Sequence, residues 1–164
     1  ENYDALINET KRVIKVVKEY IGIQEENKEV PIVHSDKKIL VVDDSDIVTG
    51  FIKKIFNNTY DVIIAKDGAA ALRLVGENMN SLIGMFLDLN MPNVDGFQVL
   101  EYFNEENLFE TIPVTIITGI DDKEDIDKLF KYSIIDVLSK PFNEKNVKIS
   151  VEKMEEKKKN VDKE

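Results

Sequence analysis

The sequence predicts an α/β fold in which helices cover both faces of a parallel β-sheet. From Lys38 onward, five short apolar runs alternate with five segments of helical periodicity. The first run, residues 39–42, is continuously apolar and rich in β-branched side chains, which is typical of a strand buried on both faces. Strands that alternate with helices form right-handed βαβ units, so we expect the sheet to be parallel.

Residues 1–22 precede this region and are predicted to form an additional helix, because apolar pairs recur every seven positions. The pairs are Leu6/Ile7, Val13/Ile14 and Tyr20/Ile21. A heptad repeat indicates a helix that packs along another helix in a coiled coil. The alternatives are a terminal helix that folds back on the domain and the last helix of a preceding domain. The polar run over residues 23–37 predicts a linker, in which the lone His34 is expected to be exposed.

The strands and helices of the main domain, residues 38–151, follow from the alternating pattern. Strands are predicted at residues 39–42, 60–65, 82–87, 113–118 and 136–138. Helices are predicted at residues 45–57, 68–78, 97–105 and 122–131, and from Asn143 into a charged extension over residues 152–164. Ser45 or Asp46 can cap the first of these helices and Asn143 the last. The apolar residues expected to face inward in the first and fourth helices are Ile47, Val48, Phe51, Ile52, Ile55 and Phe56, and Ile126, Leu129 and Phe130.

The composition fits one folded domain and disfavours several functions. The chain has 164 residues, of which 43% are hydrophobic, and a net charge of −10, which argues against nucleic-acid and anionic-membrane partners. Without cysteine, neither disulfides nor cysteine-ligated metals are possible, which suits a cytoplasmic location. No apolar run approaches the ~20 residues of a membrane span. Because the chain starts at Glu1, we expect a piece of a longer protein.

Four of the five predicted strands end in ionisable or hydroxyl residues. These residues are Asp43 and Asp44, Asp88, Thr118, and Lys140. The carboxyl ends of parallel strands share one edge of a sheet, so these groups are expected to converge there. Separate loop carboxylates are the alternative interpretation, and the agreement of four strand ends makes it improbable.

The residue types at this edge suit phosphoryl chemistry. Three carboxylates repel one another unless a cation neutralises them, and an oxygen-only ligand set favours Mg²⁺, with Mn²⁺ also possible. Lys140 and Thr118 can offset charge and donate hydrogen bonds on the oxygens of a phosphoryl group. Asp88 would then act as the nucleophile and form an aspartyl phosphate.

Residues 38–150 resemble the receiver domain of bacterial two-component response regulators. The matching motifs are Val41-Val42-Asp43-Asp44-Ser45, Leu87 to Gly96, Thr118-Gly119 and Lys140-Pro141-Phe142. The resemblance implies a flavodoxin-like (βα)5 three-layer sandwich with strand order 2-1-3-4-5, here with an extra N-terminal helix.

The resemblance also implies roles for individual residues. Asp88 would accept a phosphoryl group from a sensor histidine kinase or a phosphotransfer protein. Asp44, Asp88 and the backbone carbonyl of Asn90 would bind Mg²⁺, with Asp43 assisting through water. Lys140 and Thr118 would bind the phosphoryl oxygens, and the peptide bond before Pro141 is usually cis in this family.

The partners that the resemblance implies include an output domain in the same protein or a separate effector. The face expected to change on phosphorylation comprises the fourth helix, fifth strand and fifth helix of the repeating region, around residues 119–155. This face and the N-terminal helix are both candidate homodimer surfaces.

The sequence departs from the family pattern at Val137, which stands where the family often has Tyr or Phe. The output is therefore expected to be read through Thr118 and the loop after it, or to be weakly coupled; Tyr132 and Phe142 are interpreted as packing residues.

Two other functions remain as alternatives. Phosphatases of the haloacid dehalogenase type also use an Asp nucleophile and Mg²⁺, but they carry a second Asp two residues later as acid and base. That position is Asn90 here, so we expect a switch that catalyses only phosphoryl transfer to its own Asp and slow dephosphorylation, and not an enzyme with rapid turnover. A phosphorylation-independent docking module is the second alternative, which the intact acidic site disfavours.

Overall fold

The computed structural model describes residues 3–20, 36–91, 93–119 and 123–162. The chain divides into two compact units, Glu1–Val33 and His34–Glu164, which are described separately. The first unit contains helix α1 (Tyr3–Tyr20), as the heptad repeat predicts. Most of the expected linker, including His34, lies outside the described residues. Within the described ranges, we find no helix with the length and apolar character needed to cross a bilayer.

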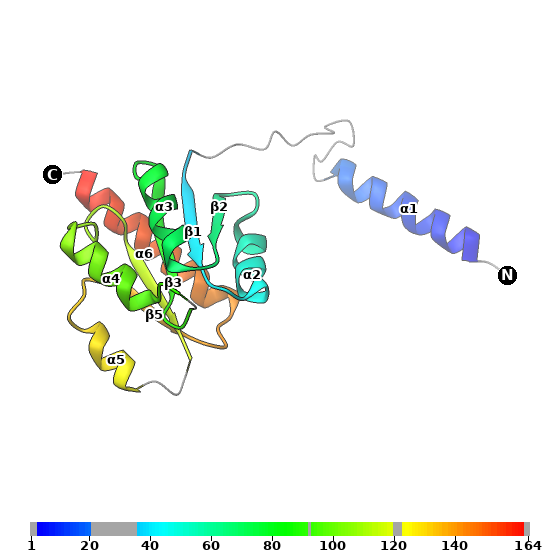
Figure 1. The fold of residues 1–164 in the computed structure, drawn as a ribbon. Coiled ribbons are helices and arrows are strands. Elements are labelled where there is room, and N and C mark those ends of the chain that lie inside the picture. The colour runs from blue at the N-terminus through cyan, green and yellow to red at the C-terminus, as the bar shows by residue number, and fades with distance from the viewer. Residues whose placement is uncertain (1–2, 21–35, 92, 120–122, 163–164) are drawn as a thin grey trace. The chain divides into compact units, whose positions relative to one another are not determined.

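The second unit is built on a five-stranded sheet in the order β2-β1-β3-β4-β5, and every pair of neighbouring strands is parallel (Figure 1). The strands are β1 (Lys38–Val42), β2 (Asp61–Ala65), β3 (Leu82–Asp88), β4 (Val114–Thr118) and β5 (Asp136–Ser139). All seven residues of β3 are buried, because this strand lies at the centre of the sheet with neighbours on both sides. The parallel sheet and its strand order confirm the predicted fold.

Helices cover both faces of the sheet, and the sheet separates two apolar cores. The helices are α2 (Asp46–Phe56), α3 (Gly68–Glu77), α4 (Gly96–Glu105), α5 (Lys123–Leu129) and α6 (Glu144–Asp162). Alternate residues of β1 illustrate the division: Leu40 and Val42 pack with residues of α3, α4 and α5, whereas Ile39 and Val41 pack with residues of α2 and α6. The domain is therefore a three-layer sandwich.

Three apolar side chains do not take the buried positions predicted for them. Ile47 is 84% exposed, Phe51 is 38% exposed, and Phe130 is 82% exposed. In α2 the residues that reach the core are Thr49, Ile52 and Phe56, which form a narrower stripe than the adjacent apolar pairs indicated. Phe130 follows the last residue of α5, so only Leu129 is fully buried at this end of the helix.

Helix α6 is long, and residues in its middle part hold it against the sheet. Val151 and Met154 are buried, and Gly84 of β3 leaves the space that Met154 occupies, since a Cβ at position 84 would lie 2.3 Å from the Met154 sulfur. The next residue, Glu155, accepts a hydrogen bond from the Tyr60 hydroxyl at 2.8 Å and lies 3.3 Å from the Lys37 ammonium. These contacts join α6 to the residues that precede β1 and β2.

Candidate functional site

Asp43 is the first residue after β1 and is completely buried. The Ser45 backbone N–H donates a hydrogen bond to Asp43 Oδ1 at 2.8 Å. Ser45 is also the N-cap of α2, where its hydroxyl accepts from the Val48 N–H. The turn that starts the helix therefore also fixes the orientation of the Asp43 carboxylate.

Asp88 is the last residue of β3 and is only 3% exposed. The Asn90 N–H donates to Asp88 Oδ1 at 3.2 Å. The loop that follows ends in a capping box at the start of α4, in which Asp95 and Gln98 exchange hydrogen bonds. Gly96 must be glycine because a Cβ there would lie 2.5 Å from the Asp88 carbonyl oxygen.

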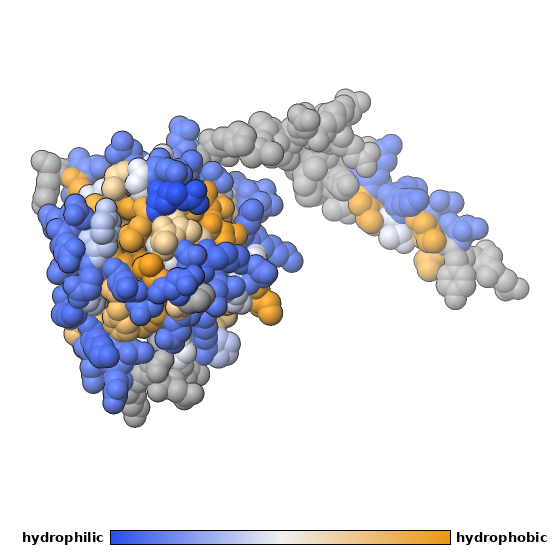
Figure 2. All heavy atoms as spheres, in the orientation of Figure 1, coloured by the Kyte–Doolittle hydropathy of each residue, from blue (hydrophilic) through white to orange (hydrophobic). Residues whose placement is uncertain are grey.

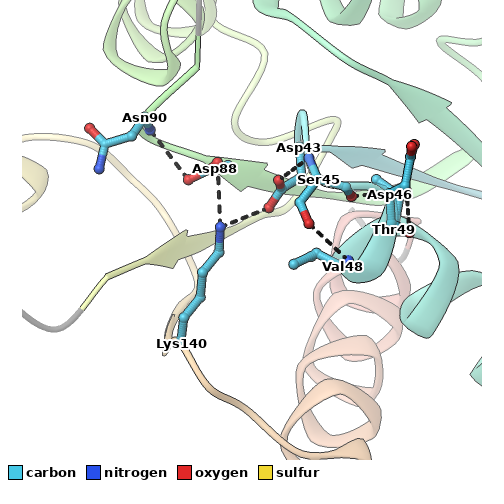
Figure 3. Close-up of polar contacts among 8 residues, drawn as sticks. All are labelled: Asp43, Ser45, Asp46, Val48, Thr49, Asp88, Asn90 and Lys140. Atoms are coloured by element: carbon cyan, nitrogen blue, oxygen red, sulfur yellow. Dashed lines mark hydrogen bonds and ion pairs between the residues drawn. The ribbon is translucent and has the colours of Figure 1, made fainter.

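Lys140 links the two buried carboxylates. It follows β5 in a turn fixed by a hydrogen bond from the Lys140 N–H to the Thr118 carbonyl at 2.8 Å, and its peptide bond to Pro141 is cis. The Lys140 Nζ atom lies 3.0 Å from Asp43 Oδ2 and 3.5 Å from Asp88 Oδ2. Figure 3 shows the lysine side chain extending from its loop to a position between the two aspartates.

The charges of this group perturb one another strongly. Burial raises the pKa of Asp88, and the negative charge of Asp43 raises it further, while Lys140 and the hydrogen bond from Asn90 act in the opposite direction without cancelling the rise. Burial on its own lowers the pKa of Lys140. The hydrogen bond to Asp43 and the charges of both aspartates outweigh that effect, so the pKa of Lys140 is raised overall. The lysine is therefore a fixed cation at neutral pH.

The carboxylates fit a divalent cation. Asp43, Asp44 and Asp88 each place one oxygen within 4.8 Å of the others, and Asp44 is exposed while the other two are buried. Apart from its ion pair with Lys140, the buried Asp43 Oδ2 has no hydrogen-bond partner among the described residues. An oxygen-only cluster that is open to solvent on one side matches the preferences of Mg²⁺, which keeps several water ligands.

Thr118 ends β4 and is completely buried. Its hydroxyl donates to the Gly119 carbonyl at 3.2 Å. Residues 120–122, which begin the loop expected to carry the output, lie outside the described residues. Tyr132 and Phe142 are packing residues, as expected, with ring centroids 6.2 Å from Phe109 and 6.1 Å from Phe51, respectively.

Two features of the site were not predicted. Lys140 contacts Asp43 more closely than Asp88, and the Ser45 N–H holds Asp43 in place. The N-cap signal at Ser45 was visible in the sequence, but its second role depends on the turn geometry between Asp43 and Ser45. The short Lys140–Asp43 distance depends on the position of the turn that carries Lys140 relative to the end of β1. No local sequence pattern encodes that position.

Comparison with known proteins places this geometry in context. The family model described as "Response regulator receiver domain" matches residues 39–152. Sensor histidine kinase TmoS of Ectopseudomonas mendocina is 33% identical over 116 residues, which cover 70% of this chain and 12% of TmoS. The alkaline phosphatase synthesis transcriptional regulatory protein PhoP of Bacillus subtilis is 33% identical over 117 residues, which cover 71% of this chain and 47% of PhoP. The match thus spans less than half of either relative.

A solved structure shows the same architecture. The response regulator receiver domain protein from Clostridium thermocellum superposes with a TM-score of 0.69 at 26% sequence identity, covering 76% of this chain and 98% of that one.

Proposed function

Because the chain belongs to the response regulator receiver domain family, we propose that it is a signalling switch in which Asp88 accepts a phosphoryl group and Mg²⁺ assists the transfer. Receiver domains are signalling modules of two-component systems rather than enzymes with external substrates. The observation that carries the proposal is the buried Asp88 carboxylate at a strand end, beside a lysine and two further aspartates.

Each residue of the site has a distinct task in this proposal. An Asp88 oxygen attacks phosphorus while the bond from phosphorus to the donor's imidazole nitrogen breaks, and the imidazole leaves with the electron pair. Asp43, Asp44, Asp88 and the Asn90 carbonyl would hold Mg²⁺, which neutralises negative charge on the transferring group when bound. Lys140 supplies a second positive charge, and the Thr118 hydroxyl would donate to a phosphoryl oxygen after it turns from the Gly119 carbonyl.

The test is chemical modification of the purified chain. With Mg²⁺ and acetyl phosphate, the wild-type chain is expected to shift in a Phos-tag gel, and Asp88→Asn is not. With beryllofluoride, which mimics the acyl phosphate, the wild-type chain is expected to give a metal-dependent fluorine NMR signal that Asp88→Asn lacks. Identical behaviour of the two proteins in both experiments would contradict the proposal.

The same preparation separates the switch from a phosphatase. A phosphatase of the haloacid dehalogenase type would release phosphate steadily from several small phosphate esters, whereas the switch would not. Asn90 favours the switch, because an amide side chain cannot act as the general acid and base that rapid hydrolysis needs.

The physiological donor and the receiver of the signal are proposed by class. A sensor histidine kinase or a phosphotransfer protein would supply the phosphoryl group, and an output domain or separate effector would respond to it. The two relatives differ in this respect, since one is named a sensor kinase and the other a transcriptional regulator.

Two surfaces are candidates for self-association. On α1, five aliphatic side chains are between 48% and 64% exposed, and Figure 2 shows them as hydrophobic groups along an otherwise hydrophilic helix. These side chains are Leu6, Ile7, Val13, Ile14 and Val16. The second candidate is the face of α5, β5 and α6, which exposes Phe130, Val137 and Ile149. We favour α1, because its seven-residue repeat is the pattern by which two helices of the same kind pack together.

A further inference from the structure

The loop that follows Asp88 is held at more than one point. At its start, the Leu89 N–H donates to the Ile117 carbonyl at 3.3 Å, and at its end the Gly96 N–H donates to the Leu89 carbonyl at 3.2 Å. Between these points, Asn93 has a φ of 66°, a left-handed conformation that Asn tolerates better than most residues. This turn precedes Val94, whose carbonyl oxygen accepts a hydrogen bond at 3.0 Å from the N–H of Gly68.

Gly68 belongs to a different part of the fold. It is the first residue of α3 and is buried, and Asp67 before it caps the helix by accepting from the Ala70 N–H at 2.8 Å. A Cβ at position 68 would lie 2.5 Å from the Val94 carbonyl oxygen, 2.6 Å from Val94 Cγ1 and 2.9 Å from Val94 Cβ. All three distances are shorter than real Cβ contacts, and one of the atoms is backbone, so the loop would have to move.

We propose that Gly68 is a positioning residue for the phosphorylation site, because its missing side chain allows the Asp88 loop to dock against the start of α3. The inference rests on the function proposed above. Val94 lies four positions after Asn90, whose N–H orients the Asp88 carboxylate and whose carbonyl is a proposed Mg²⁺ ligand. A displacement at Val94 is therefore expected to reach the metal site through the loop backbone.

The other glycines provide a matched control. Gly76 lies in the same helix, and a Cβ there would meet no atom within 4 Å. Gly76→Ala therefore makes the same chemical change in α3 without touching the loop. Because alanine is the better helix former, this control is expected to keep or slightly raise the stability of the fold.

The experiment measures binding of Mg²⁺ alone, followed by the backbone amide NMR shifts of residues 88–91 and 93–96 in the full chain. Removing a group that orients metal ligands typically weakens binding by about 10- to 100-fold. Gly68→Ala is expected to raise the half-saturating Mg²⁺ concentration by a factor in this range, whereas Gly76→Ala leaves it at the wild-type value. Adding Val94→Gly to Gly68→Ala removes two of the three close contacts and is expected to lower that concentration again. Phosphorylation by acetyl phosphate at limiting Mg²⁺ should slow in the same order.

A loss of stability alone does not produce this pattern, because folded molecules would still bind Mg²⁺ with wild-type affinity. Equal Mg²⁺ affinity in Gly68→Ala and Gly76→Ala would overturn the inference. If Gly68→Ala does not fold, hydrogen exchange of the Gly68 amide in the wild-type chain provides the test. Mg²⁺ is expected to slow this exchange, since coupling between two sites is reciprocal, and unchanged exchange would overturn the inference. If the wild-type chain is never phosphorylated, the proposed function is wrong. The Mg²⁺ titration still tests whether Gly68 positions the metal site.

Discussion

At the scale of single residues, the site depends on a charge imbalance that folding itself creates. Two buried carboxylates, Asp43 and Asp88, share one ammonium group at 3.0 Å and 3.5 Å, and Asp44 adds a third negative charge at the surface. The raised pKa of Asp88 follows from its burial and from Asp43. Without a metal, burying the charged form of this carboxylate is unfavourable, because the form is better solvated in water.

The first prediction concerns stability in the absence of metal. Because the pKa of Asp88 is raised on folding, the folded state binds the proton more tightly than the unfolded state. The associated stabilisation is complete below the ordinary pKa of 3.8 and is lost as the pH rises through the raised value. Asp88→Asn should therefore be more stable than the wild type at pH 7 in EDTA, and the difference should shrink on acidification, as measured by urea unfolding.

Addition of Mg²⁺ should reverse this order. A cation at about one hundred times its dissociation constant stabilises the protein that binds it by about 2.7 kcal/mol, and Asp88→Asn should gain less. Asp127→Asn, which removes an exposed carboxylate from α5, is the control and should show neither effect. A wild type that equals or exceeds Asp88→Asn in stability at pH 7 without metal would contradict the electrostatic account of the site.

The residues of this group could be identified from the sequence, but their pairwise geometry could not. Asp43, Asp44, Asp88 and Lys140 each follow a recognisable apolar strand, and parallel strands must bring these ends together. The close approach of Lys140 to Asp43 depends on the turn before Pro141. The fit between Gly68 and Val94 depends on two loops separated by more than twenty residues. Such distances arise from packing and leave no periodic signal in the sequence.

At the scale of elements, helix α6 continues into its charged extension, as the sequence predicts. Its second half is rich in lysine and glutamate and continues as one helix to Asp162, with Met154 buried and Glu155 bonded to Tyr60. Helix α2 differs from its prediction, because Ile47 and Phe51 of its adjacent apolar pairs are exposed. Helical periodicity identifies which side of α2 is apolar, but only the packing of the folded domain shows that Ile52 is buried and Ile47 is not.

The second prediction tests the contact that holds α6. Burial raises the pKa of Tyr60 to about 12, and its hydrogen bond to Glu155 contributes in the same direction. Tyr60→Phe removes this hydrogen bond and is expected to lower the free energy of unfolding by about 1 kcal/mol near pH 8. Because the neutral hydroxyl is the form favoured by the fold, the advantage of the wild type should diminish as the pH rises from 10 towards 12.

Urea unfolding at a series of pH values, with absorbance titration of the tyrosines, measures both effects. Tyr102→Phe is the matched control, since the Tyr102 side chain on α4 is 40% exposed. Equal losses of stability for the two variants would show that the Tyr60–Glu155 bond does not contribute to holding α6.

At the scale of the whole molecule, the chain combines a well-packed sheet domain with a helix that exposes its apolar side chains. A helix of 18 residues with this exposure gains most by packing against another helix. A second copy of the chain provides the same heptad repeat.

The third prediction is therefore self-association through α1. Val13→Glu combined with Ile14→Glu places charges on the apolar stripe and is expected to convert the full chain from dimers to monomers in analytical ultracentrifugation. Lys15→Glu changes the net charge by the same amount at a polar position of the same helix and should leave the dimer intact. A wild-type chain that stays monomeric at all concentrations would contradict self-association and point to another partner for α1. A dimer that survives the double substitution would point to the α5–β5–α6 face instead.

The contact of Glu155 with Lys37 has a consequence for how the domain can be combined with others. The chain enters the sheet through Lys37 and leaves it along α6, and this ion pair brings the two points together at the sheet edge where β1 begins. Asp88 lies at the other end of its strand, where the strands finish. A domain whose entrance and exit are neighbours can be inserted into a longer polypeptide, or joined to it at either end, without a connection crossing the proposed phosphorylation site.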